Sequence, residues 1–183
     1  MSQFDLVILY SGGADSRLMV ELAKTAKKKF LLLMIDYGQL HKVELEYAAK
    51  DCEKNRWSYR LVKLSLPINS GLTGDGIKNT SSEVHEMHVP GRNSIFLSLA
   101  FSIAESVDAD TIWIGCDWSD RIHLFPDCYQ EYLIRMNEAF KFAGPKPINV
   151  EAPIIGFTKE LVISMLENSG IDMTNVYSGY GDL

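Results

Sequence analysis

The sequence predicts an α/β domain in which helices cover both faces of a parallel sheet. Short apolar segments alternate with helix-like segments, the central apolar segments are almost free of polar residues, and a glycine-rich turn follows the first of them. Strands that are buried on both faces have such continuous apolar sequences. With 183 residues, the chain fits one domain over 1–183.

Each element is expected where the local pattern changes. Strands are predicted at 4–10, 30–36, 59–66 and 111–116, and helices at 15–28, 42–55, 93–107, 127–142 and 158–169. Segment 67–91 is long for a connection and rich in polar and glycine residues, so we expect a lid loop there. Because ligands of parallel sheets bind at the carboxyl ends of the strands, the residues that follow Tyr10, Asp36 and Cys116 are candidates for the site.

Composition narrows the class of protein. Apolar residues make up 46% and charged residues 23%, as in soluble globular proteins. The net charge of −6 predicts no direct binding of nucleic acid. No segment is long and apolar enough for a membrane span, and Asp5 interrupts the first apolar run, which is unlike a signal peptide. We therefore expect a cytoplasmic protein without membrane contact.

Cysteine usage agrees with that compartment. The chain has three cysteines, Cys52, Cys116 and Cys128, without C-x-x-C spacing. This number and spacing argue against a disulfide framework and against a thiolate zinc site.

The glycine-rich turn at 11–16, Ser-Gly-Gly-Ala-Asp-Ser, predicts a phosphate site. Gly12 and Gly13 let the backbone approach an anion, and the helix that follows adds unpaired N–H groups. Ser11 and Ser16 can donate hydroxyl hydrogen bonds, and Asp15 can hold Mg²⁺. The turn lacks the Gly-Lys-Ser/Thr of a Walker loop and the G-x-G-x-x-G of the dinucleotide fingerprint.

This turn resembles the SGGxDS loop of the ATP pyrophosphatase (PP-loop) superfamily. The resemblance implies a Rossmann-like fold of the adenine nucleotide alpha hydrolase type. It also implies an enzyme that cleaves ATP between the α and β phosphates and activates its substrate as an adenylate.

Two further motifs follow predicted strand ends or turns. Asp36 can accept a hydrogen bond from a ribose hydroxyl and Tyr37 can stack on a base, or Asp36 can simply cap the next helix. After the Pro-Gly turn, Asn93 is predicted to cap a helix that holds Arg92 near a phosphate or carboxylate. The alternative is a solvent-exposed arginine on a capped helix.

The later motifs also allow two interpretations each. Asp117 follows Gly115 after the fourth predicted strand. Asp127 can pair with the N–H edge of a guanine-like heterocycle or cap the next helix. Cys128 is predicted to be a buried thiol rather than a nucleophile. Lys159 begins the last helix, where a cation is unfavourable unless an anion binds, although a surface lysine is an equal alternative.

Taken in order, the motifs resemble those of the 7-cyano-7-deazaguanine synthase family. That family shows SGG-x-DS, DYGQ-x-H-x-x-E, VPGRN-x-x-FLS, a G-x-x-x-D segment with PDC, and a lysine before the last helix. The corresponding segments here are 11–16, 36–44, 89–98, 115–128 and 159–160. The departure is at the end of the chain, where Val176 replaces the first of four zinc-binding cysteines and the other three are absent. We therefore expect no structural zinc.

The resemblance implies an ATP- and Mg²⁺-dependent carbon–nitrogen ligase that forms AMP and pyrophosphate. Its substrates would be 7-carboxy-7-deazaguanine and ammonia, and its product the nitrile or, with the altered tail, the amide. The implied nucleotide-binding residues are Tyr10, Ser11, Gly12, Gly13, Ser16, Asp36 and Tyr37. The implied catalytic residues are Asp15, which also binds the metal, Arg92 and Lys159, and the implied substrate-binding residues are Arg92, Asn93, Asp117 and Asp127.

A homodimer is the expected assembly. Two alternatives remain open at this point: another adenylating PP-loop enzyme, and a non-catalytic relative that only binds the nucleotide.

Overall fold

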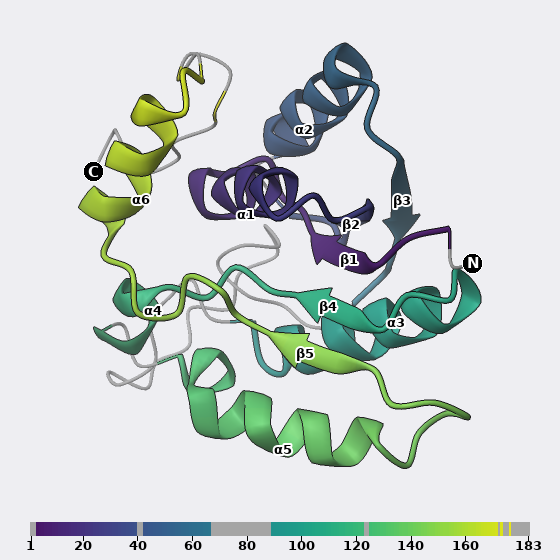
Figure 1. Ribbon diagram of the computed structural model, residues 1–183. Helices are drawn as coiled ribbons and strands as arrows, with labels where there is room; N and C mark the ends of the chain where they lie inside the picture. The colour runs from purple at the N-terminus through teal and green to yellow at the C-terminus, as the bar shows by residue number, and fades with distance from the viewer. Residues whose placement is uncertain are drawn as a thin grey trace.

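A computed structural model describes residues 3–39, 42–66, 89–122 and 125–171, together with residues 173 and 176. Most of the predicted lid, 67–88, lies outside the described residues. Five parallel strands form one sheet in the order β3-β2-β1-β4-β5 (Figure 1). The strands are β1 (Leu6–Leu9), β2 (Phe30–Asp36), β3 (Tyr59–Lys63), β4 (Thr111–Trp113) and β5 (Asn149–Glu151).

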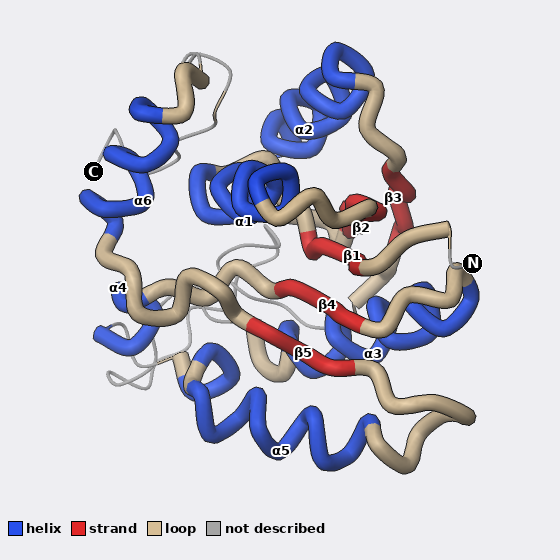
Figure 2. Tube along the Cα trace, viewed as in Figure 1, coloured by secondary structure: helices blue, strands red, loops and turns tan. Residues whose placement is uncertain are grey.

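Helices lie on both sides of this sheet, as the sequence predicts (Figure 2). They are α1 (Ala14–Thr25), α2 (Lys42–Asn55), α3 (Arg92–Ser106), α4 (Trp118–Ile122), the 3₁₀ turn η1 (Pro126–Cys128), α5 (Gln130–Phe140) and α6 (Lys159–Asn168). None of the helices in the described part of the chain is long and apolar enough to cross a membrane.

The alternation of side chains along the strands builds two cores. Leu6 and Ile8 of β1 pack with residues of α1 and α2 on one face of the sheet. Val7, between them, packs with residues of α3 and α5 on the other face. All three side chains have no exposed surface, because successive residues of a strand point to opposite faces. A third cluster joins α1 to α6 through Leu18, Val162 and Leu166.

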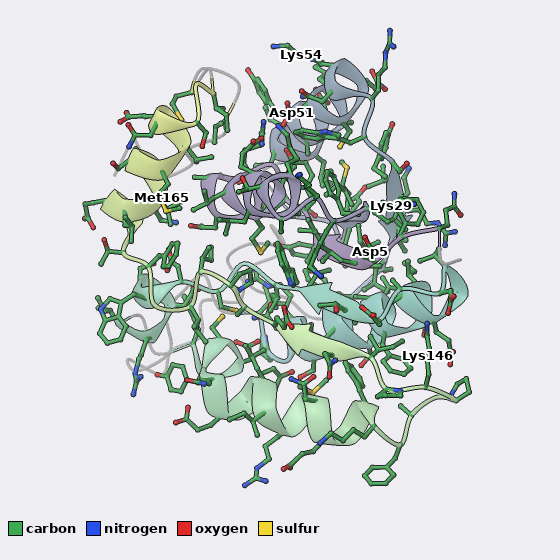
Figure 3. All side chains as sticks on the ribbon, in the orientation of Figure 1. Asp5, Lys29, Asp51, Lys54, Lys146 and Met165 are labelled. Carbon is green, nitrogen blue, oxygen red and sulfur yellow. The ribbon has the colours of Figure 1, made fainter. Side chains whose placement is uncertain are left out.

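The start of β1 is fixed by a side chain. Asp5 Oδ2 accepts a hydrogen bond from the backbone N–H of Lys29 at 2.7 Å, and both residues are labelled in Figure 3. The backbone N–H of Asp5 donates to the carbonyl of Lys29, also at 2.7 Å. These bonds align β1 with β2 so that both strands end at the same edge.

The predicted elements differ from the structure in several places. Helix α4 was not predicted, α1 ends at Thr25 rather than at 28, and β3 ends at Lys63 rather than at 66. The strand at Asn149–Glu151 was not predicted, because only its central Val150 is apolar and buried. The fourth strand ends at Trp113 rather than at 116, and the following residues lead into α4. The helix predicted from 127 begins at Gln130, because residues 126–128 form a 3₁₀ turn.

Gly12 is the backbone position on which the glycine-rich turn depends. Its φ is +86°, and an added Cβ would lie 2.9 Å from Ala48 Cβ and 3.0 Å from the carbonyl oxygen of Glu44, both on α2. The turn therefore needs both the left-handed conformation and the missing side chain.

We predict that Gly12→Ala lowers the free energy of unfolding more than Gly38→Ala does. Gly38 has a similar φ of +84°, but no atom of the described residues lies within 4 Å of an added Cβ there, so this position isolates the conformational cost. That cost is about 1 kcal/mol, whereas the clash at Gly12 brings the total to at least about 2 kcal/mol. Urea unfolding of the two variants measures the difference, and equal losses would contradict the close packing of the turn on α2.

Candidate functional site

The glycine-rich turn connects β1 to α1 and is held by its own serines. Ser16 Oγ donates to the carbonyl oxygen of Gly13 at 2.9 Å, and the backbone N–H of Ser11 donates to Ser16 Oγ at 3.3 Å. The N-cap residue of α1 is Gly13, which provides no capping side chain. The N–H groups of the first helical turn have no partner within the helix, so the turn has the form of an anion site.

Beside this turn, Lys159 lies between two carboxylates from different parts of the chain. Its Nζ is 2.6 Å from Asp15 Oδ2 and 3.1 Å from Asp117 Oδ2. Asp15 is in the first turn of α1, Asp117 follows β4, and Lys159 is the first residue of α6. The structure thus brings together three residues that the sequence analysis had named separately.

Local hydrogen bonds explain how these residues are positioned. Thr158 caps α6 by accepting the N–H of Leu161 at 3.3 Å, which places Lys159 at the helix start. Asp117 Oδ1 accepts the N–H and the hydroxyl of Ser119 at 2.8 and 2.5 Å. The Asp117 side chain is fixed in this way while its other oxygen faces Lys159.

Burial sets the electrostatics of the two carboxylates. Burial raises the pKa of Asp15, and the nearby Lys159 offsets only part of that effect. For Asp117, burial acts in the same direction, but hydrogen bonds from Ser119 and the charge of Lys159 outweigh it and lower its pKa. Burial opposes the charge of Lys159 as well, yet the two carboxylates raise its pKa. The arrangement is therefore a shared cation between two carboxylates.

Two oxygens of this group are suited to a metal ion. Asp15 Oδ1 is buried and accepts no hydrogen bond from the residues that the structure describes. Asp117 Oδ2 is buried as well and lies 3.1 Å from Lys159 Nζ. Buried carboxylate oxygens without donors are costly unless a cation binds them. Hard oxygen ligands of this type suit Mg²⁺, so the residues fit the predicted metal.

Tyr10 was predicted to contact the nucleotide, but its side chain points elsewhere. Its ring is only 3% exposed, and its hydroxyl donates to Asp51 Oδ2 at 2.8 Å. Asp51 also pairs with Arg17 Nε at 3.0 Å, which in turn pairs with Glu21. This buried network joins α1 to α2 (Asp51 is labelled in Figure 3) and leaves only the backbone of Tyr10 next to the turn. Sequence reasoning missed it because Arg17 and Asp51 are remote in the chain.

The end of β2 lies near the start of α3. Asp36 Oδ1 accepts the backbone N–H of Gly38 at 3.2 Å, which closes a local turn. Because α2 begins at Lys42, the alternative that Asp36 caps this helix is wrong. The Tyr37 ring lies 5.3 Å from that of Phe96, and its hydroxyl accepts a hydrogen bond from Arg92 at 3.5 Å. Two predicted motifs therefore meet at Tyr37 and Arg92.

The prediction that Asn93 caps α3 is wrong. The N-cap is Gly91, with φ of 66°, and the helix begins at Arg92. Asn93 is buried, and its side-chain amide donates to the carbonyl of Asp127 at 3.3 Å and to Cys128 Sγ at 3.2 Å. Asp127 Oδ2 accepts the backbone N–H of Asn93 at 3.3 Å, so Asp127 stabilises the start of α3. Its predicted alternative role as cap of α5 is wrong, since α5 begins at Gln130 with Tyr129 as its N-cap.

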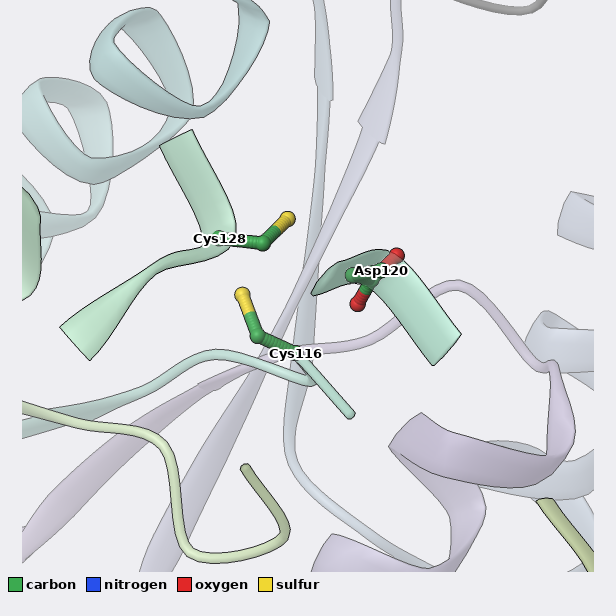
Figure 4. A group of neighbouring side chains, drawn as sticks. All are labelled: Cys116, Asp120 and Cys128. Carbon is green, nitrogen blue, oxygen red and sulfur yellow. The ribbon is translucent and has the colours of Figure 1, made fainter. Parts of the chain in front are cut away.

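A cluster that sequence reasoning missed lies next to these residues. The ligand atoms of Cys116, Asp120 and Cys128 all lie within 4.8 Å of one another, and Figure 4 shows the three side chains as neighbours. Both thiols are buried, as predicted for Cys128. Burial raises the pKa of Asp120 to about 6. The Asp-x-x-Asp spacing of Asp117 and Asp120, typical of reciprocal capping, is the signal that could have drawn attention to Asp120.

The fold and the glycine-rich turn define a PP-loop protein of the adenine nucleotide alpha hydrolase type. The solved structure of U34-tRNA thiolase NcsA from Methanococcus maripaludis, with its [4Fe-4S] cluster, matches with a TM-score of 0.62 and 17% identity over 100% of this chain. The chain spans 63% of that structure's length. NH3-dependent NAD synthetase from Campylobacter jejuni matches with a TM-score of 0.58 and 16% identity, over 100% of this chain and 71% of the other. At these identities the likeness shows the fold.

Sequence comparison identifies the family within this class. Residues 5–182 match the family described as "Queuosine biosynthesis protein QueC". The 7-cyano-7-deazaguanine synthase of Alteromonas mediterranea is 33% identical over 96% of this chain and 84% of its own length. That of Prochlorococcus marinus subsp. pastoris is 35% identical over 95% and 83%. The chain therefore belongs to the 7-cyano-7-deazaguanine synthase family.

We predict that Lys159→Met destabilises the Mg²⁺-free protein by about 1–2 kcal/mol near neutral pH. This loss of stability is smaller than the loss that follows removal of one partner of a fully buried ion pair, because the Lys159 side chain is 36% exposed. Without the cation, the folded-state pKa of Asp15 rises further above its unfolded value, and this lowers stability at pH values where Asp15 is ionised in the unfolded chain. The difference from wild type should therefore be largest at about pH 7.5 and shrink towards about pH 5.

Thermal unfolding at several pH values measures this effect. Lys146→Met is the matched control, since Lys146 pairs with the exposed Asp108. A loss that does not vary with pH, or one no larger than that of the control, would contradict the shared-cation arrangement.

Proposed function

We propose that this protein is an ATP-dependent ligase that adenylates the carboxylate of 7-carboxy-7-deazaguanine and amidates it with ammonia in the cytoplasm. The observation that carries the proposal is the group of Asp15, Asp117 and Lys159 at the edge of the glycine-rich turn. Membership of the 7-cyano-7-deazaguanine synthase family supplies the substrate class. The class of enzyme, a synthase of the PP-loop type, follows from the same comparisons.

The turn and its neighbours suit the triphosphate of ATP. The N–H groups at the start of α1 and the hydroxyls of Ser11 and Ser16 would bind the β and γ phosphates, which leave as pyrophosphate. Asp15 and Asp117 would hold Mg²⁺, which neutralises charge on the phosphates when bound. With the metal bound, Lys159 would turn from the two carboxylates towards the α-phosphate oxygens, where charge develops.

The start of α3 suits recognition of the deazaguanine. Asp127 uses Oδ2 for the backbone N–H of Asn93, and its other oxygen would accept from the N–H edge of the heterocycle. The side-chain amide of Asn93 donates a hydrogen bond to the backbone carbonyl of Asp127 and so holds Asp127 in place. Arg92, which already donates to Tyr37, would pair with the substrate carboxylate before its adenylation.

The chemistry explains why ATP is needed. A carboxylate does not react with ammonia, because it is anionic and would have to expel an oxide or hydroxide. Transfer of AMP neutralises the carboxylate and supplies a good leaving group, so ammonia can form the amide. A second activation, at the amide oxygen, would allow elimination to the nitrile. These steps need positioning and charge stabilisation rather than a protein nucleophile.

A homodimer remains our expectation for the assembly.

Val176 leaves a second product of the reaction open, because this valine stands where the family resemblance predicts a zinc-binding cysteine. The reaction could stop at the amide. A nucleotide-binding relative without turnover, or an enzyme that adenylates another substrate, would fail the following assay in distinguishable ways.

We predict that the purified protein converts 7-carboxy-7-deazaguanine, ammonium, ATP and Mg²⁺ to the nitrile with release of pyrophosphate. Mass spectrometry of the products measures the outcome. Amide as the final product would define a one-step enzyme. Bound ATP without pyrophosphate release would contradict the proposal, and so would pyrophosphate release only with a different carboxylate.

We predict that Asp15→Asn and Asp117→Asn each lower kcat by at least about 100-fold, because each removes an anionic ligand next to the reacting phosphates. Asp108→Asn serves as the matched control, since Asp108 is an exposed carboxylate that also pairs with a lysine. Activity of either site variant within a few-fold of this control would show that the two carboxylates do not hold the metal.

A further inference from the structure

We propose that Cys116, Asp120 and Cys128 form a Zn²⁺ site that is separate from the predicted Mg²⁺ site. This zinc site does not depend on the proposed reaction. The three residues come from different short segments: Cys116 follows β4, Asp120 lies in α4, and Cys128 ends η1. Figure 4 shows the three side chains as close neighbours. Two thiols and a carboxylate lie together here, although the cysteines do not have the C-x-x-C spacing that is typical of a thiolate zinc site.

The spacing of the ligand atoms suits tetrahedral zinc. All three lie within 4.8 Å of one another. Zinc–sulfur bonds of about 2.3 Å and zinc–oxygen bonds of about 2.1 Å place tetrahedral ligands roughly 3.5–3.8 Å apart. Small side-chain rotations would therefore close the site around the ion. Two sulfur ligands favour Zn²⁺ over Mg²⁺, which prefers oxygen ligands only.

Neighbouring groups already orient two of the three ligands. The side-chain amide of Asn93 donates to Cys128 Sγ at 3.2 Å, a contact that stabilises a thiolate. The backbone N–H of Asp117 donates to Asp120 Oδ2 at 2.9 Å, which leaves the other carboxylate oxygen for the metal. Hydrogen bonds of this kind to the ligands are typical of protein metal sites.

Burial also fits a site that retains its metal. Cys116 is 1% and Cys128 7% exposed, so the sulfur ligands are shielded from water and from competing thiols. A disulfide would use the two sulfurs but would give no role to the carboxylate beside them. A metal ion uses all three groups, and three protein ligands leave the fourth tetrahedral position for water or another small ligand.

The location of the cluster suggests a structural role for the metal. Cys116 is the chain neighbour of Asp117, and Cys128 is the chain neighbour of Asp127. Zinc would tie the end of β4 to η1 across α4 and so fix both carboxylates that the proposed reaction needs. Zinc is in this sense a positioning element for the site rather than a participant in the chemistry.

The test is the zinc content of the full chain, produced with added zinc and purified without chelators. We expect about one zinc per chain by mass spectrometry of the metal. Most of the bound zinc should be lost in each of three variants: Cys116→Ser, Cys128→Ser and the nearly isosteric Asp120→Asn. Cys52→Ser is the matched control, because Cys52 is equally buried but lies in α2, away from the cluster.

Cobalt replacement provides a second measurement that needs no variant. The wild-type protein loaded with Co²⁺ should show thiolate charge-transfer absorption and visible bands of tetrahedral cobalt, and circular dichroism verifies that each variant is folded. Folded wild-type protein that binds neither metal would overturn the proposal. Retention of zinc in the folded Cys116→Ser and Cys128→Ser variants would overturn it too, as would an intact mass showing a Cys116–Cys128 disulfide in place of metal.

Discussion

The ion pair of Lys159 with Asp15 and Asp117 is the interaction on which the candidate site depends. It joins the first turn of α1, the segment after β4 and the start of α6, three pieces that lie far apart in the chain. The apolar cluster between α1 and α6 holds the two helices together. This packing does not depend on the charge of Lys159, and it places the lysine next to the carboxylates. A buried pair of carboxylates would be unfavourable without this cation or a metal ion in its place.

The same arrangement is compatible with the nucleotide binding that we propose for this site. The single positive charge of Lys159 offsets only part of the negative charge of Asp15 and Asp117. A divalent cation brought in with the nucleotide would take over that role, and the lysine would become available to the phosphates. Asp15 Oδ1, which accepts no hydrogen bond from the described residues, and Asp117 Oδ2, which faces Lys159 Nζ, are the buried oxygens that this exchange would use.

Local patterns predicted much of the fold and named most of the residues that the structure brings together in the candidate site. The glycine-rich turn was recognised because a strand, two glycines and a helix start follow directly in the sequence, and Asp117 and Lys159 were named from their positions next to predicted elements. What could not be predicted was which of these residues meet, since that depends on the strand order and on the packing of α6. Asn93 shows the limit most clearly: its position suggested a cap, but the approach of η1 gives its side chain Asp127 and Cys128 as partners. The strand Asn149–Glu151 was not predicted, because its composition does not indicate a strand. It becomes a strand through its pairing with β4.

The most direct test of the site is a crystal structure with Mn²⁺ and a non-hydrolysable ATP analogue, in which anomalous scattering locates the metal. The expected result is a manganese peak coordinated by Asp15 and Asp117, with the triphosphate on the turn at 11–16 and Lys159 moved from the carboxylates to the phosphates. A nucleotide bound away from this turn, or a metal ion that touches neither carboxylate, would contradict the assignment of the site.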